Sequence, residues 1–223
     1  MNKPWHKKWW GILLIALLTI ALMLLSAFGF LLIDITKQTQ TQAGKSAFVA
    51  KTIPKEILGE DNYWIGSANP KITLVEFADF ACPHCANTFP VMRELSIKYK
   101  KDIKIIFRDF PVITETSGDL ALAARCAGEQ GFFWVMHDKL FLNQGISTGD
   151  QLKELAKQTG VNMDKFNTCF DGKKYLSKIQ KDLTDGNNLG VTGTPTWFIN
   201  GQKVAGDIPL SGFEQIIKEI LNN

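Results

Sequence analysis

The chain has 223 residues, enough for one domain of ordinary size and an additional segment. Its 25 basic and 22 acidic side chains leave a net charge of +3, which is too small to indicate a nucleic-acid-binding protein. The sequence also contains no glycine-rich phosphate loop and no nucleotide-binding signature.

The first predicted element is a transmembrane helix over residues 11–33, a stretch without a charged side chain. A helix of this length extends for roughly 35 Å, and the hydrocarbon core of a bilayer is about 30 Å thick. Lys3, Lys7 and Lys8 precede the stretch. Because basic residues stay on the cytoplasmic side, they predict a cytoplasmic segment at 1–10 and place the rest of the chain outside the cell membrane.

A cleaved signal peptide is the alternative for this segment. The apolar core of a signal peptide has about 7–15 residues and is followed by small residues at the cut. The apolar stretch here is longer, and a cut after Ala27 would place Leu25 where a small residue is required. The sequence therefore favours an uncleaved, single-pass anchor, and both alternatives export the remainder of the chain.

Residues 34–60 form a predicted linker, because they are polar and lack a sustained periodicity. The globular domain is predicted over residues 61–223. It begins with two β-rich runs, 71–77 and 103–107, on either side of a helical pattern in residues 86–100. This order of strand, helix and strand requires a right-handed crossover and predicts a parallel strand pair.

The rest of the domain is predicted to be a helical insertion followed by two strands and a helix. Amphipathic stretches separated by glycines fill about 115–190. Strands are predicted at 196–199 and 202–205, because the Asn-Gly pair between them is a strong hairpin signal. With a last helix at about 210–221, the domain belongs to the α/β class.

Cys82 and Cys85 form a CxxC motif. Such a motif can be half of a zinc site, a redox-active dithiol or an inert buried pair. A structural zinc site needs a second pair of ligands at short spacing, whereas Cys126 and Cys169 are far apart and have no histidine at ligand spacing. No metal site is therefore predicted.

The residues around the motif favour the redox dithiol. A helix that begins near Pro83 places the sulfur of Cys82 at a helix N-terminus, where unpaired N–H groups and the helix dipole favour an anion. Pro83 suits the first turn of a helix, and His84 can donate to a thiolate or repel its proton. These features predict a lowered pKa for Cys82. Cys85, one turn later, is predicted to be the more buried, resolving thiol.

The Cys-Pro-His-Cys motif at 82–85, after a strand that ends in Leu-Val-Glu-Phe at 74–77, resembles the DsbA-type branch of the thioredoxin superfamily. The segment Val-Thr-Gly-Thr-Pro-Thr at 191–196 is similar to the cis-proline loop of that superfamily. The resemblance covers about residues 61–222, and the helical insertion is similar to that of membrane-anchored members. It implies a thioredoxin fold with a helical insertion, thiol–disulfide oxidoreductase activity, and no organic cofactor or metal.

The resemblance also implies roles for residues outside the motif. Pro195 would be the cis residue, and the backbone of Thr194 would pair with a substrate strand. The alternative is an ordinary trans proline that opens a strand. An acid at the position of Glu76 would lie buried beneath the dithiol and relay a proton for Cys85. By residue type alone, this glutamate would be a solvent-facing strand residue.

Cys126 and Cys169 lie in predicted helices of the insertion. Two buried free thiols are one alternative, because cysteine packs well as a small hydrophobic residue. Similar patterns in membrane-anchored relatives carry a cysteine pair here, so the resemblance implies a structural disulfide. Closing this loop would stabilise the domain by roughly 4 kcal/mol on a chain-entropy estimate.

The resemblance implies that a monomer donates the Cys82–Cys85 disulfide to exported cysteine-containing proteins during oxidative folding. A membrane protein of the DsbB type or the vitamin K epoxide reductase type would then reoxidise the dithiol. One alternative is that a protein with the same fold acts as a disulfide reductase or isomerase. Isomerases usually carry a dimerisation domain, however, and residues 34–60 are too short to form one. The other alternative is a holdase that binds exported chains without using its thiols.

Overall fold

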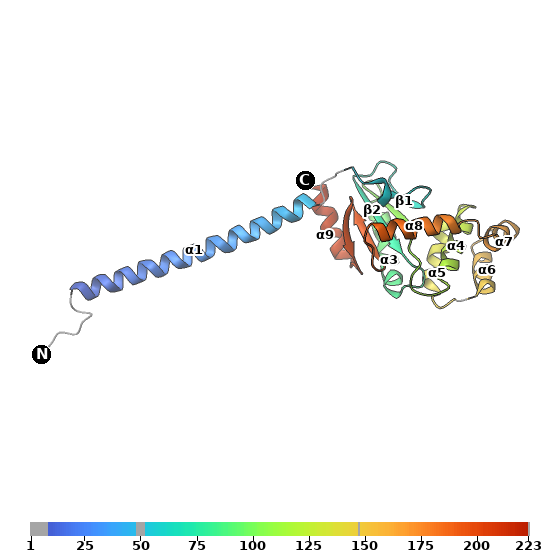
Figure 1. The fold of residues 1–223 in the computed structure, drawn as a ribbon. Coiled ribbons are helices and arrows are strands. Elements are labelled where there is room, and N and C mark those ends of the chain that lie inside the picture. The colour runs from blue at the N-terminus through green and yellow to red at the C-terminus, as the bar shows by residue number, and fades with distance from the viewer. Residues whose placement is uncertain (1–8, 48–51, 147, 223) are drawn as a thin grey trace. The chain divides into compact units, whose positions relative to one another are not determined.

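The computed structural model describes residues 9–47, 52–146 and 148–222. The chain divides into two compact units after Ala47, and each unit is described by itself. Figure 1 shows their helices and strands in chain order.

The first unit contains helix α1, Trp9–Ala47. Its stretch Leu13–Thr36 has a mean hydropathy of 2.6 and is, by length and composition, able to cross a bilayer. Residues 34–47 of the predicted linker continue this helix instead of forming an irregular segment. Residues 1–8 of the predicted cytoplasmic end and 48–51 of the linker lie outside the described residues.

A five-stranded sheet with the strand order β1-β3-β2-β4-β5 forms the centre of the second unit. The strands are β1 Trp64–Gly66, β2 Ile72–Ala78, β3 Ile103–Asp109, β4 Thr196–Ile199 and β5 Gln202–Ala205. Strands β2 and β3 are parallel, as the strand–helix–strand pattern predicts, and β4 and β5 form the predicted hairpin. The fold is therefore of the predicted α/β class.

Two short elements are absent from the sequence prediction. Strand β1 has three residues, and helix α2, Lys55–Leu58, has four. Neither is long enough to show a hydrophobic periodicity. Tertiary contacts, rather than local sequence, therefore decide the structure of these residues.

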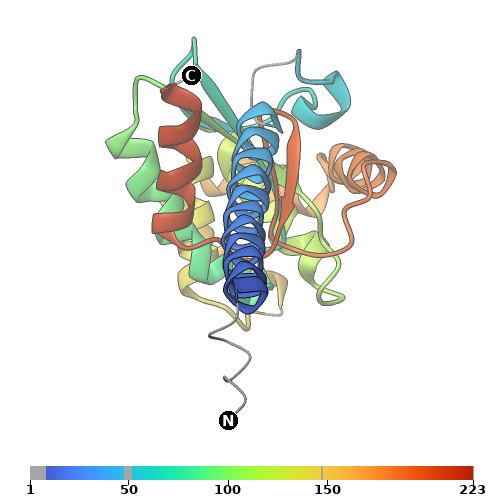
Figure 2. The ribbon, with the colours of Figure 1, turned by 90° about the vertical axis from the view of Figure 1, so that its left-hand side faces the viewer.

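Helices cover both faces of the sheet. Helices α3, Pro83–Lys98, and α9, Leu210–Leu221, lie on one face, and α2 and α8, Leu176–Asn188, lie on the other (Figure 2). The side chains that fill the two interfaces alternate along β2: Ile72 and Leu74 face α3 and α9, whereas Val75 and Phe77 face the other layer. Because both faces are covered, all seven residues of β2 are buried.

The predicted insertion forms a helical layer beside the sheet. It consists of α4 Ser117–Gly128, α5 Phe133–Leu142, α6 Gly149–Lys157, α7 Met163–Asp171 and α8. Its apolar core is continuous with the residues around the dithiol, because Phe80 and Phe107 of the sheet region pack into the same cluster as the insertion helices. A disulfide joins Cys126 of α4 to Cys169 of α7, which is the pairing that the resemblance implies.

A buried group of ion pairs fastens α2 and α8 to the sheet. Arg108 of β3 is fully buried and pairs with Asp182 and Asp185 of α8, each at 2.7 Å. The same guanidinium donates hydrogen bonds to the backbone carbonyls of Glu56 and Ile57 in α2, at 2.9 and 3.0 Å. One side chain therefore holds three elements that are far apart in the sequence.

A second arginine extends this group into the insertion. Arg125 of α4 pairs with Asp182 at 2.7 Å and also with Asp109 at the end of β3. A buried charge without its partner is costly, whereas a complete group of pairs is tolerated. Each member of the group therefore depends on the others.

We expect Arg108→Leu to lower the free energy of unfolding by about 3–5 kcal/mol, because it leaves buried carboxylates short of a partner. Denaturant unfolding of the purified protein measures this. The matched control is Lys153→Ala, which breaks the exposed ion pair with Asp171 and should change the free energy by less than about 1 kcal/mol. Equal effects of the two substitutions would contradict the proposed importance of burial.

Candidate active site

The dithiol lies at the junction between β2 and α3. Strand β2 ends at Ala78, and Cys82 is the N-cap residue of α3, with Pro83 in the first helical position. The backbone N–H of Cys82 donates to the carbonyl of Asp79 at 3.0 Å and closes the turn. The Cys82 carbonyl accepts from Ala86 at 3.1 Å and starts the helix. The sulfur of Cys82 therefore lies at the helix N-terminus, as the sequence predicts.

The loop that contains Pro195 lies against this helix end. The peptide bond between Thr194 and Pro195 is cis. The Cys82 thiol donates to the Thr194 carbonyl at 3.2 Å. The Thr194 hydroxyl oxygen is buried and has no conventional hydrogen-bond partner within the described residues. The Thr194 carbonyl thus lies against the sulfur of Cys82, and the Thr194 side chain also interacts with that sulfur.

The two cysteines are free thiols in different environments. The pKa of Cys82 is lowered to about 5, chiefly by the hydrogen bond from the Cys85 side chain. Burial opposes this shift, and interactions with the Thr194 side chain and with the backbone N–H groups of Cys85 and His84 support it. In the reduced protein at neutral pH, Cys82 is therefore a thiolate.

The imidazole of His84, which the sequence predicts can donate to the Cys82 thiolate or repel its proton, is exposed to solvent. Its side chain is 66% exposed, and its Nδ1 lies 3.8 Å from a carboxylate oxygen of Asp207. The leading contribution of His84 to the low pKa of Cys82 comes from its backbone N–H, which belongs to the first turn of α3. The side chain itself is directed towards solvent and Asp207.

Glu76 is buried in the centre of the sheet. It is 2% exposed and lies between Phe107 of β3 and Trp197 of β4. It shares the face of β2 that α3 covers, because it alternates with Val75 and Phe77. Burial, followed by the charge of the Cys82 thiolate, raises its pKa to about 8. The carboxyl group therefore holds a proton at neutral pH.

Cys85 is the less acidic thiol. Burial raises its pKa first of all, and both the hydrogen bond to Cys82 and the charge of Glu76 add to the increase. The charge of Glu76 thus acts on Cys85, the charge of the Cys82 thiolate acts on Glu76, and both Glu76 and Cys85 are buried. The arrangement can move a proton between a carboxyl group and a thiol while Cys82 remains ionised.

Asp79 fixes the loop before the dithiol on one side. Its carboxylate accepts hydrogen bonds from the backbone N–H groups of Ala81 at 2.8 Å, Val112 at 2.7 Å and Ile113 at 2.8 Å. It therefore joins the loop at 79–82 to the loop that follows β3.

Gln144 holds the same loop on the other side. Its side-chain amide donates to the carbonyls of Phe80 at 3.1 Å and Cys82 at 2.9 Å. Sequence reasoning misses this residue, because it lies in the α5–α6 loop, 62 residues after Cys82. A surface glutamine in a loop carries no signal of such a contact.

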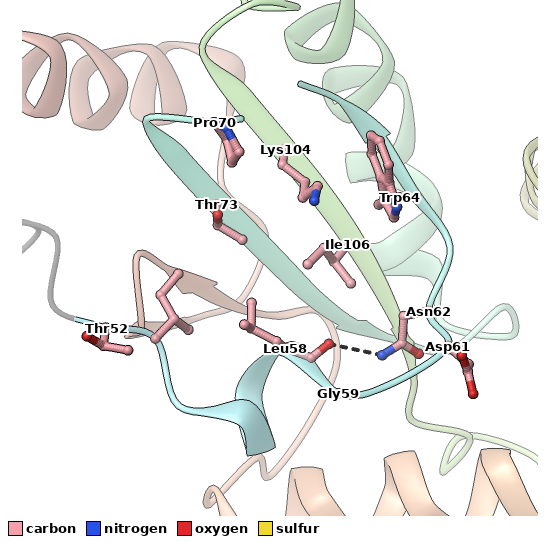
Figure 3. A pocket seen from close by; sticks show the side chains of 11 residues that line it. Thr52, Leu58, Gly59, Asp61, Asn62, Trp64, Pro70, Thr73, Lys104 and Ile106 are labelled. Atoms are coloured by element: carbon pink, nitrogen blue, oxygen red, sulfur yellow. Dashed lines mark hydrogen bonds between the residues drawn. The ribbon is translucent and has the colours of Figure 1, made fainter. Parts of the chain in front are cut away.

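A different hollow of about 670 Å³ lies over the sheet (Figure 3). It is lined by Thr73 of β2, by Lys104 and Ile106 of β3, and by parts of the segment 52–64. Thr73 is near the start of β2, whereas the dithiol follows the end of that strand, so this hollow does not belong to the redox site. Within the described residues, no group of three or more histidine, cysteine or acidic side chains could hold a metal ion.

Comparison with known proteins identifies relatives. The family model described as Thioredoxin matches residues 59–219. The Na(+)/H(+) antiporter NhaA 3 of Salinispora tropica is 32% identical over 143 residues, which are 63% of this chain and 22% of the antiporter. The antiporter NhaA of Herminiimonas arsenicoxydans is 24% identical over 188 residues, 84% of this chain and 30% of that protein. The chain thus spans less than a third of these relatives, and their antiporter activity is not assigned to it.

Three solved structures are similar to most of this chain. A periplasmic thioredoxin-like protein from Salmonella enterica serovar Typhimurium is 28% identical, with a TM-score of 0.65 over 78% of this chain and all of the other. The thiol-disulfide exchange protein α-DsbA2 from Wolbachia pipientis is 22% identical, with a TM-score of 0.69 over 82% and 98%. BdbD from Bacillus subtilis is 23% identical, with a TM-score of 0.66 over 78% and 98%. The last two comparisons bear on the fold alone.

The residues that match the family model begin before β1 and end within α9, so they include both thiols and the loop that faces them. The TM-scores of 0.65–0.69 show that these structures share the overall fold of this chain. The chain therefore belongs to the thioredoxin family, and Cys82 and Cys85 form a CxxC pair within the matched residues.

Proposed function

We propose that the protein oxidises thiols outside the cytoplasm by donating the Cys82–Cys85 disulfide to exported cysteine-containing proteins. The observation that carries this proposal is the low pKa of Cys82, about 5. A stabilised thiolate stabilises the reduced protein relative to the disulfide form. The disulfide is then readily passed to other thiols, which makes the protein an oxidant.

The proposed reaction has two exchange steps. A client thiolate attacks the sulfur of Cys82, the Cys82–Cys85 bond breaks, and Cys85 leaves as a thiolate. A second client thiolate then attacks the client sulfur of the mixed disulfide and releases Cys82 as a thiolate. Two electrons pass from the client to the protein, and the client gains the disulfide. The low pKa of Cys82 favours its departure in the second step.

Glu76 is the proposed proton donor and acceptor for Cys85. Its carboxyl group holds a proton at neutral pH and can pass it to the sulfur of Cys85 when the disulfide opens. Thr194 and the cis residue Pro195 are the proposed client-binding residues, because an exposed backbone edge beside the dithiol can pair with an extended client segment.

The proposed location is a cell membrane, with α1 as a single-pass anchor and the catalytic domain on the extracytoplasmic side. The apolar stretch Leu13–Thr36 and the lysines before it support this placement. The similar protein from Salmonella enterica is described as periplasmic. The protein would act as a monomer, and a membrane protein of the DsbB or vitamin K epoxide reductase type would reoxidise it.

The first prediction concerns the direction of electron flow. Thiolate absorbance should give a midpoint near pH 5 for Cys82. Thr194→Val should raise that pKa by about 1 unit, because a hydrogen bond to a charged group is worth roughly 1.5–3 kcal/mol, and should make the protein less oxidising in a glutathione buffer. His84→Ser should change both properties less, because the backbone N–H remains. A Cys82 that titrates like a free cysteine, in a protein as reducing as thioredoxin, would favour a reductase instead.

The second prediction concerns Glu76. Its pKa rises from 4.5 in the unfolded chain to about 8 in the folded, reduced protein. Its stabilising contribution is therefore complete below about pH 4.5 and is lost as the pH rises through 8. Glu76→Gln should remove this loss of stability at high pH. The substitution should also slow the release of the mixed disulfide more than its formation. Denaturant unfolding between pH 5 and 9 and single-turnover exchange measure the two effects. The exposed Glu94→Gln is the control, and identical behaviour of both variants would reduce Glu76 to a packing residue.

The third prediction concerns topology. Alkaline phosphatase fused after Asn223 should be active, whereas a reporter that works only in the cytoplasm should be inactive at that position, because the basic residues lie before the apolar stretch. The reverse result would place the dithiol in the cytoplasm and would contradict the proposed location.

A further inference from the structure

We propose that a pocket beside the dithiol binds a lysine or arginine that lies next to the reacting cysteine of a client protein. This inference rests on the proposed oxidation of client thiols, and it names a class of client for the same site. The pocket has a volume of about 390 Å³, within the range of pockets that bind small groups in proteins.

The pocket begins at the residues that precede Cys82. Its floor is formed by Phe80, Leu120 and Leu140, which are all buried. One wall is the segment 114–116, which leads into α4, and the other is the segment 143–146 after α5. Phe80 and Ala81 belong both to the pocket and to the active-site loop. When a client is bonded to Cys82 through its cysteine, a client side chain next to that cysteine can therefore reach the pocket.

Hydrogen bonds hold both walls against the active-site loop. Asp79 binds the backbone of Val112 and Ile113, directly before the first wall, and also the backbone of Ala81. Gln144 of the second wall binds the carbonyls on either side of Ala81. The pocket is therefore built on the same fixed turn that positions Cys82, and it keeps its place relative to the sulfur.

The pocket lies away from the cis-proline loop. Neither Thr194 nor Pro195 contributes to its lining, although Cys82 contacts the carbonyl of Thr194. A client segment that pairs with Thr194 on one side of its cysteine can therefore continue towards the pocket on the other side. The two contacts would together recognise residues on both sides of the reacting sulfur.

The residues that line the pocket indicate which kind of side chain it binds. Glu115 is the one charged residue among the described residues that line the pocket, and no ion pair is formed by its carboxylate within the described part of the chain. The floor is apolar, and the rim carries hydroxyl and amide groups. A lysine or arginine has an aliphatic stem for such a floor and a cationic end for such a rim. A glutamate would meet repulsion, and a small residue would leave the floor uncovered.

The surface next to the pocket is also suited to a polypeptide. Val112 and Ile113 are 48% and 45% exposed, although large apolar side chains of the second unit are mostly buried. They directly precede the first wall and are fixed by Asp79. Exposed apolar side chains beside a pocket favour contact with a partner. They provide a place for the client residues beyond the basic one.

The test compares reduced peptides that contain two cysteines and differ in one residue beside the first cysteine: lysine, norleucine or glutamate. The oxidised full-length protein converts each dithiol to a disulfide, and quenched samples give the second-order rate constant. At low ionic strength, we expect the lysine peptide to react about threefold faster than the norleucine peptide and about tenfold faster than the glutamate peptide. A fourth peptide, with the lysine moved six residues away, should react like the norleucine peptide.

Variants of the exposed Glu115 identify the origin of the preference. Glu115→Gln should make the lysine and norleucine peptides equal, and Glu115→Lys should make the glutamate peptide faster than the lysine peptide. Glu154→Gln removes an acid from an exposed position on α6, away from the pocket, and should retain the wild-type order. Oxidation of dithiothreitol, which is too small to reach from the sulfur into the pocket, should be equal in all four proteins.

The outcomes separate this inference from the proposed function. If the wild type oxidises all peptides at one rate, or if the preference survives Glu115→Gln, the pocket does not select basic residues, but the oxidase function stands. An equal advantage for the displaced lysine would also overturn the inference, because it would indicate general electrostatic attraction. If the wild type oxidises neither the peptides nor dithiothreitol, the proposed function itself fails.

Discussion

The contact between the start of α3 and the cis-proline loop is the constraint on which the rest of the site depends. Strands β2 and β4 pair so that Phe77 lies beside Thr196. The residues after β2 and those before β4 are therefore brought to the same edge of the sheet, where Cys82 meets Thr194 at 3.2 Å. The register of one strand pair thus brings two segments, separated by the whole helical insertion, within hydrogen-bond distance.

Burial and hydrogen bonding give the ionisable groups at this edge of the sheet different pKa values. Cys82 keeps polar donors around its sulfur and ionises easily, whereas Cys85 and Glu76 are surrounded by apolar side chains and hold their protons. The apolar core of the helical insertion packs against both cysteines and therefore contributes to the burial of the dithiol. The insertion therefore sets the environment of the thiols as well as the shape of the surface around them.

The sequence predicts the parts of the structure that depend on long or strongly patterned segments. The parallel strand pair, the hairpin at 196–205 and the helical insertion follow from periodicity and turn residues, and the disulfide follows from the resemblance. Strand β1 and helix α2 are too short to show a pattern, and Arg108 holds α2 in place from a distant strand. The direction of the His84 side chain could not be predicted, because it lies near Asp207 from another part of the chain. The contacts of Gln144 could not be predicted either, because they also join parts of the chain that are far apart in the sequence.

The buried position of Arg108 has a consequence for the order of folding. Its partners lie 52 residues earlier in α2 and 74 residues later in α8, so α2 can dock fully only after α8 has been synthesised. Cys126 precedes its disulfide partner by 43 residues. A chain that emerges from its N-terminus therefore exposes three thiols, those of Cys82, Cys85 and Cys126, before the fourth is present. The packing of α7 against α4 brings Cys126 and Cys169 together and so favours this pair over the other possible pairs.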